Sequence, residues 1–257
     1  GVGDWDGALA LAERTIADAR AFGQRTLLPR LLVWSALVHT GRGDFALANT
    51  QIEEAWALSG ADHTGDTSIV NVHTVVPAHA GRAAWHLARM EYAQAITVGE
   101  AGLAIADRTG YSAWAIHRLM PIVAEAALWI RDWARADRYT ARLRETADRL
   151  GHRLGLAWAD ACVAIVHMLR GDDAGAVPLL RNAAVALEGI PFTDYAARVR
   201  CQLAIALRDS NDREGAIAEL RNVHAVYARL GAQPSLDYVR ELLRSLGVRP
   251  PARAAVA

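Results

Sequence analysis

The sequence contains no lysine, so all 28 of its basic residues are arginines. Its acidic residues also number 28, which brings the formal net charge to zero. Domains that bind nucleic acid usually carry a basic surplus or a basic stripe along one face. Because the chain shows neither, we expect this segment to make no direct contact with nucleic acid.

Cysteines and long apolar runs are also scarce. Cys162 and Cys201 are the only cysteines and lie far apart, which gives neither a disulfide framework nor a metal-ligand spacing. The sequence shows no signal peptide and no apolar run of about 18 residues. These absences predict a chain without membrane contact, in a reducing cytoplasm.

Sequence motifs of catalysis are missing as well. The chain has no GxxxxGK[ST] phosphate loop, no GxGxxG after a strand, no HExxH and no GxSxG. His73, His79 and His86 fall on one expected helix, but a zinc site needs three or four ligands within bonding reach. We expect core or surface histidines, with a site built from several helices as the alternative. The prediction is a protein that is not an enzyme and holds no cofactor or metal.

What the sequence does contain is a repeat built around an anchor position, which is aromatic in the first four copies. The anchors are Trp5, Phe45, Tyr92, Trp133, Asp173 and Arg213, at steps of 40, 47, 41, 40 and 40 residues. An acidic residue precedes each anchor, and an alanine follows three residues later. Further alanines stand nine residues before the later anchors, at Ala36, Ala83, Ala124, Ala164 and Ala204. Glycines follow 15 to 18 residues after the anchors, at Gly23, Gly60, Gly110, Gly151, Gly189 and Gly231.

Each repeat predicts two antiparallel helices, A and B, joined at the anchor. Small residues on both sides of the joint let the helices approach closely, and the glycine suits the left-handed residue that ends helix B. An aspartate at the joint is well placed to cap the start of helix B. The expected helices cover 4–22, 26–40, 44–59, 70–89, 91–109, 111–130, 132–150, 152–169, 172–188, 191–208, 212–230 and 234–246. No segment alternates with period 2, so we predict an all-α right-handed superhelix of about six repeats and no sheet.

Some segments depart from the simple repeat. Pro121 falls inside an expected helix, which it should kink or restrict to a start near residue 120. Pro178 predicts a later start for the helix at 172–188, and residues 60–68 predict a polar loop of extra length. We expect residues 1–248 to form one domain whose first repeat lacks helix A. The tail, residues 249–257, is expected to be disordered.

The acidic–aromatic–x–x–Ala joint, with an alanine nine residues before it, resembles the helix junction of the tetratricopeptide superfamily. Steps near 40 residues exceed the usual period of about 34. They resemble the maltose-activator (MalT-like) helical region of large bacterial LuxR-type regulators and signal-transduction ATPases. Residues 227–248, YARLGAQPSLDYVRELLRSLGV, are similar to the last helices of such regions. The resemblance implies a concave groove, lined by the A helices, that binds an inducer or a partner protein.

Positions fifteen residues before the anchors would face such a groove. They hold Arg30, Pro77, Arg118, Trp158 and Arg198, and the neighbouring columns add Glu125, Trp129 and Met168. Arginine forks bind carboxylates and phosphates, and tryptophan offers an apolar or cation-binding face. We therefore expect a groove for an acidic peptide or a small anionic ligand, with solvated arginines at helix starts as the alternative. Most of the other tryptophans are expected to pack between repeats.

The sequence as a whole predicts a non-enzymatic binding or sensor scaffold. We interpret it as the regulatory segment of a larger cytoplasmic bacterial transcriptional regulator, which recognises a peptide, a partner protein or a small effector. One alternative is self-association, as a homodimer or as the oligomerisation module of a signalling ATPase or nucleotide cyclase. The other is a stand-alone adaptor.

Overall fold

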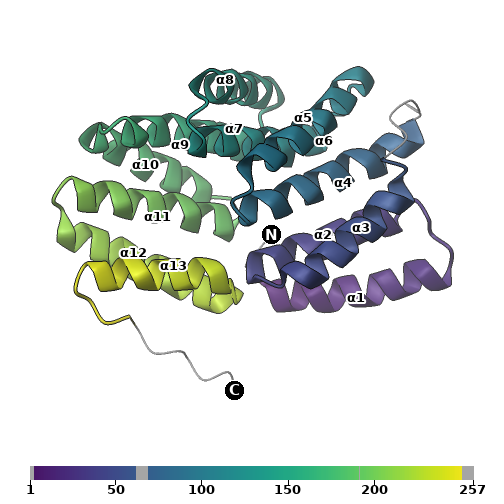
Figure 1. Cartoon of the computed structure of the whole chain (residues 1–257), viewed down its shortest axis with the longest axis horizontal. Coiled ribbons are helices and arrows are strands. Elements are labelled where there is room, and N and C mark those ends of the chain that lie inside the picture. The colour runs from purple at the N-terminus through teal and green to yellow at the C-terminus, as the bar shows by residue number, and fades with distance from the viewer. Residues whose placement is uncertain (1–2, 62–68, 191, 251–257) are drawn as a thin grey trace. The chain divides into compact units, whose positions relative to one another are not determined.

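The computed structural model describes residues 3–61, 69–190 and 192–250, with the backbone alone for 69–71. Within these ranges every regular element is a helix, and no residue lies in a strand (Figure 1). The all-α prediction is therefore confirmed. Residues 62–68 of the expected polar loop and residues 251–257 of the expected tail lie outside the described residues.

The helices match the expected spans to within two residues at each end. They are α1 (Trp5–Ala21), α2 (Leu28–Arg42), α3 (Phe45–Ser59), α4 (Ile69–Ala88), α5 (Tyr92–Thr109), α6 (Ser112–Trp114), the π-helical segment η1 (Ala115–Leu119), α7 (Met120–Trp129), α8 (Trp133–Leu150), α9 (Arg153–Leu169), α10 (Asp173–Glu188), α11 (Thr193–Asp209), α12 (Arg213–Leu230) and α13 (Gln233–Ser245). The repeat register fixes these boundaries, because each joint and each closing glycine interrupts the helical pattern.

The chain divides into two compact units. One comprises Asp6–Gly155, and the other comprises Leu156–Ala257 together with Gly1–Trp5. In the first unit α2 packs against α3, α4 against α5, and α7 against α8. In the second unit α11 packs against both α10 and α12, and α12 packs against α13. Both units therefore use helix hairpins as their building block, and the expectation of a single domain over residues 1–248 stays a prediction.

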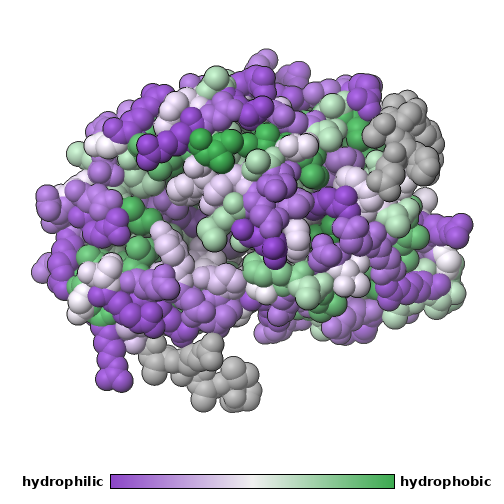
Figure 2. All heavy atoms as spheres, viewed as in Figure 1, coloured by the Kyte–Doolittle hydropathy of each residue, from purple (hydrophilic) through white to green (hydrophobic). Residues whose placement is uncertain are grey.

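Small residues make the close helix contacts that the repeat predicted. The alanines nine residues before the anchors are at most 1% exposed, and the alanines three residues after the anchors are fully buried from the second repeat onward. Outward-facing positions are polar instead: in Figure 2 hydrophilic residues cover the outer side of α8. The alternation of alanine contacts and polar outer faces accounts for the stacking of hairpins.

The joint between helices A and B has one backbone conformation throughout. The residue two positions before each anchor has a positive φ, at Gly3, Gly43, Met90, Arg131, Gly171 and Asn211. From the second joint onward the next residue, always acidic, returns its backbone N–H to a carbonyl five residues earlier, as Asp44 does to His39 at 2.9 Å. The acidic residue is also the predicted N-cap, and the Asp132 carboxylate accepts the N–H of Arg135. The left-handed position was not predicted from the sequence, because four different residue types occupy it.

Two expectations about helix ends and prolines need correction, at Gly189 and at Pro178. Gly189 has a φ of −73°, so it does not adopt the left-handed conformation that the other closing glycines share. Its N–H bonds back to Val185 and Leu187, which ends α10 without a left-handed residue. Pro178 does not delay α10, which begins at Asp173 and accommodates the proline within the helix. The prediction for Pro121 is confirmed: α7 begins at Met120 with the proline in its first turn, directly after the π-helical segment η1.

Candidate binding surface on α2 and η1

Trp34 on α2 is the most exposed tryptophan among the described residues, with 39% of its surface accessible. Its ring centroid lies 4.9 Å from that of Trp114 on α6 and 6.5 Å from that of His117 on η1. Arg30 precedes Trp34 by one helical turn and therefore shares its face of α2. An exposed tryptophan held by two buried or half-buried rings is a rigid apolar platform.

The π-helical segment places the second arginine. Pro121 has no backbone N–H to donate, and just before it the N–H of Met120 bonds to Ala115, five residues back. This wider turn carries Arg118, whose guanidinium carbon lies 5.7 Å from the centre of the Trp34 ring. Single π-helical turns inside α-helices occur frequently at functional sites.

Burial and neighbouring charges fix the charge state of the cluster. Burial, Arg118 and His152 lower the pKa of His117 to about 3, so this imidazole is neutral at pH 7. Burial also raises the pKa of the Tyr111 hydroxyl, and the positive charge of Arg30 opposes that rise. The buried Nε of Arg30 has no hydrogen-bond partner among the described residues. The positive charge of the cluster therefore comes from its two arginines.

We call this cluster the Trp34 surface, and it consists of Arg30, Trp34, Tyr111, Trp114, His117 and Arg118. Its donors and its exposed aromatic face come from α2, from η1 and from the turn before α6. The sequence selected Arg30 and Arg118 as groove residues but grouped Trp34 with the tryptophans that are mostly expected to pack between repeats. The signal that could have identified Trp34 is its spacing of four residues from Arg30 on one helix face.

The other predicted site residues do not join the Trp34 surface. Glu125 and Trp129 form their own pair on α7, where the Trp129 indole N–H donates to a Glu125 carboxylate oxygen at 3.5 Å. Trp158 and Arg198 pair within the second unit, with the guanidinium carbon 5.2 Å from the ring centre. Met168 is half-buried near the end of α9. The structure thus divides the predicted column into separate clusters.

The Trp158 cluster, made of Trp158, Tyr195 and Arg198, has its aromatic rings buried, whereas the Trp34 surface has an exposed tryptophan. Trp158 is 2% exposed, and its ring packs edge to face against Tyr195 at 4.8 Å between centroids. Tyr195 is itself 4% exposed. Since its ring is buried and already contacts Tyr195 and the Arg198 guanidinium, Trp158 acts as a packing residue.

The histidines behave mainly as packing and capping groups. His79 is 3% exposed, and its Nδ1 lies 2.9 Å from the Val75 carbonyl oxygen one turn earlier. The Nδ1 atoms of His86 and His167 lie 2.7 and 2.8 Å from the carboxylates of Glu91 and Asp172 at the joints. Among the described residues, no group of three or more potential ligands could hold a metal ion.

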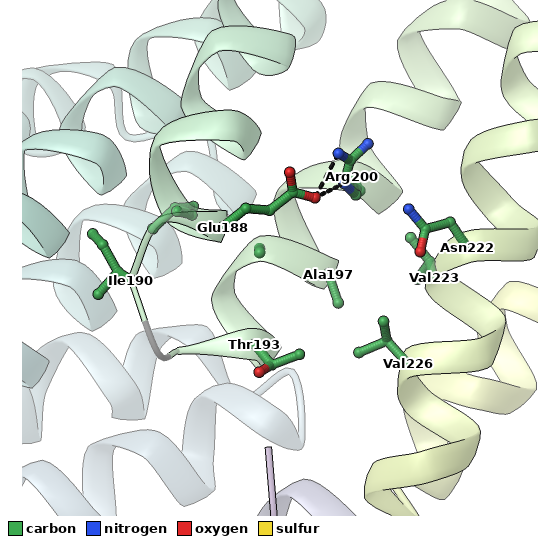
Figure 3. A pocket seen from close by; sticks show the side chains of 10 residues that line it. Glu188, Ile190, Thr193, Ala197, Arg200, Asn222, Val223 and Val226 are labelled. Atoms are coloured by element: carbon green, nitrogen blue, oxygen red, sulfur yellow. Dashed lines mark hydrogen bonds and ion pairs between the residues drawn. The ribbon is translucent and has the colours of Figure 1, made fainter. Parts of the chain in front are cut away.

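A separate hollow lies in the second unit, between α10, α11 and α12 (Figure 3). Its volume of about 130 Å³ is below the roughly 300–1,000 Å³ of pockets that enclose whole small-molecule ligands. None of the predicted site residues lines it. It is therefore too small to be the effector site that the sequence suggested.

Comparison with known proteins supports the fold class. No family model matches the chain, and no curated protein matches it by sequence. The fold is similar to the crystal structure of BtubC (BKLC) from P. vanneervenii, with a TM-score of 0.58. That similarity covers 99% of this chain and 97% of the BtubC chain at 15% sequence identity. At this identity the likeness shows an all-helical, repeat-like fold and nothing about function.

No helix among the described residues is long and apolar enough to cross a membrane.

Proposed function

We propose that this chain is a non-enzymatic helical-repeat scaffold that binds an acidic segment of a partner at the Trp34 surface. One observation carries the proposal: an exposed tryptophan is held rigidly with one arginine over its ring and another one turn away. Tryptophan and arginine are the residues most enriched at the energetic centres of protein interfaces.

The chemistry of the surface favours a carboxylate with an apolar neighbour. A guanidinium donates to a carboxylate through charge-assisted bonds that are stronger than neutral ones. The low pKa of His117 keeps the imidazole from adding charge, and its ring instead supports Trp34. An aliphatic or aromatic side chain beside the carboxylate would cover the exposed indole face.

The test uses a peptide probe in which glutamates flank a leucine, with a glutamine version as the neutral control. We expect the double variant Arg30→Ala, Arg118→Ala to bind the acidic probe at least tenfold more weakly, since each charged hydrogen bond contributes about 1.5–3 kcal/mol. Fluorescence anisotropy of the labelled probe measures the change. Arg198→Ala is the matched control, because it removes an arginine from a tryptophan that is already covered.

Equal binding of the acidic probe by wild type and the double variant would remove the Trp34 surface from the proposal. Loss of binding in Arg198→Ala alone would move the site to the second unit. Preference for the glutamine probe would show that the recognised group is not a carboxylate.

The proposal extends to a cytoplasmic regulatory segment of a larger bacterial transcriptional regulator. Its support is the repeat step near 40 residues and the likeness of residues 227–248 to the last helices of such proteins. The complete reading frame tests it: an ATPase with a phosphate loop upstream and a helix-turn-helix downstream would support the assignment. Light scattering at several concentrations tests the self-association alternative, which a persistent monomer would exclude.

A further inference from the structure

The hollow between α10, α11 and α12 has an apolar floor and a polar rim. Leu187, Ala197 and Val223 are at most 2% exposed and form buried parts of its lining. Figure 3 shows Arg200 and Asn222 on neighbouring parts of the opening, one on α11 and the other on α12. We call this feature the α10–α12 pocket; it lies outside the Trp34 surface and in the other unit.

Arg200 and Glu188 line the pocket as an ion pair, and Glu219, outside the lining, also bonds to Arg200. The Nε of Arg200 lies 2.6 Å from a Glu188 carboxylate oxygen, and one terminal nitrogen lies 2.6 Å from a Glu219 carboxylate oxygen. The hydrogen bonds raise the pKa of Arg200 against the opposing effect of its burial, so the group stays cationic. Two carboxylates on one guanidinium leave a surplus of one negative charge. An acidic ligand would therefore be repelled here, unlike at the Trp34 surface.

The size of the pocket selects a single side chain. Its volume of about 130 Å³ is close to that of an apolar cavity of about 150 Å³ that binds benzene. A leucine, isoleucine or valine side chain can fill such a space, while its backbone remains at the rim. There the exposed Asn222 offers both an amide donor and a carbonyl acceptor, which suit a peptide group.

We propose that the α10–α12 pocket is a second binding site that takes one aliphatic side chain of a partner segment with neutral or basic neighbours. The apolar floor holds the side chain, and Asn222 bonds to the adjacent peptide group. The surplus carboxylate charge of Glu188 and Glu219 sets the preference against acidic neighbours. This site does not depend on the function proposed for the Trp34 surface.

The probes are N-acetyl-leucine methylamide and its alanine and aspartate counterparts, added at millimolar concentration to the isotope-labelled full chain. We expect the leucine probe to shift the backbone amide signals of Ala197, Asn222 and Val223 in a saturable way. The alanine and aspartate probes should bind at least tenfold more weakly. The leucine–alanine ratio reports the apolar floor, and the alanine–aspartate ratio, between two probes that both lack the leucine side chain, reports the charge of the rim.

Three variants separate binding from folding. Val226→Phe, on the half-buried rim, should fill the pocket and weaken leucine-probe binding at least tenfold. Val185→Phe is the matched control, because Val185 is 60% exposed on α10 and does not line the pocket. Asn222→Ala should weaken binding by a smaller factor of two to ten, which isolates the contribution of the amide.

The proposal is overturned if the leucine probe shifts no pocket signal, or if Val226→Phe binds it as well as wild type while amide signals elsewhere stay unchanged. Stronger binding of the aspartate probe would show an anion site instead. Failure of these measurements leaves the acidic-peptide test at the Trp34 surface unaffected, since the two tests use different residues and different probes.

Discussion

Arg118 over Trp34 and Arg198 over Trp158 are the same pair of residue types in a similar arrangement, one pair in each unit. The guanidinium carbons lie 5.7 and 5.2 Å from the ring centres. Yet Trp34 is 39% exposed and Trp158 is 2% exposed. The position of the tryptophan within helix A makes the difference: Trp158 occupies the column of Arg30 and Arg118, whereas Trp34 lies four residues further along. Residue type alone therefore does not separate a binding pair from a packing pair.

The strongest test of this comparison is the loss of each tryptophan. Trp158→Ala should lower the free energy of unfolding by about 3–5 kcal/mol, the usual cost of truncating a large buried aromatic side chain. Trp34→Ala should cost less than half as much, because much of the ring already contacts water. Urea unfolding followed by circular dichroism measures both, and equal losses would contradict the distinction between the open and the closed cluster.

Acid should affect the Trp34 surface through His117. Its pKa is about 3 in the folded chain and returns to about 6.5 on unfolding. Between these values the unfolded chain binds more protons, so stability present above pH 6.5 declines toward pH 3, by at most about 1.4 kcal/mol per pH unit. Urea unfolding at several pH values should show a shallower decline for His117→Gln than for wild type. Parallel pH profiles would mean that His117 is not held neutral in the fold.

Helix α5 packs against η1, which carries His117 and Arg118 of the Trp34 surface, and this packing can be changed without substituting a residue of that surface. A Cβ on Gly102 of α5 would lie 2.7 Å from the Cβ of His79 and 3.0 Å from a Leu119 methyl at the end of η1. Gly102→Ala should therefore lower stability by about 1–3 kcal/mol, as overpacking usually does. Ala104→Ser, at an exposed position of the same helix, serves as the control. A neutral effect of Gly102→Ala would show that α5 and η1 are less tightly packed than described.

The smallest expected effect compares joints with and without glycine. Met90 and Arg131 hold the left-handed conformation, with φ of 61° and 57°, whereas glycine holds it at Gly43 and Gly171. A side chain costs roughly 1–2 kcal/mol there, so Met90→Gly should raise the free energy of unfolding by up to about 1 kcal/mol after the entropy cost of glycine. Gly171→Ala should have the opposite sign in the same urea experiment.

The sequence was sufficient for the helices and their hairpins, because the repeat imposes the same apolar spacing and the same joint on each unit. It was not sufficient for the site. Arg30 and Arg118 could be selected by register, but their convergence on Trp34 depends on the π-helical turn before Pro121. No spacing rule predicts such a turn, since it reflects how the whole segment accommodates the proline. The α10–α12 pocket was missed for a similar reason: its volume depends on how three helices pack.

The joint between the two helices of a repeat has a consequence for how such a chain can evolve. Its backbone geometry is the same with glycine, methionine, arginine or asparagine at the left-handed position. A junction that tolerates this variety needs no matched partner elsewhere in the protein. Gene duplication or deletion of a whole repeat would then join two existing helices through a turn that already works. Such a change of length would keep a surface made within one repeat, whereas the Trp34 surface, built from α2, α6 and η1, depends on the order of its repeats.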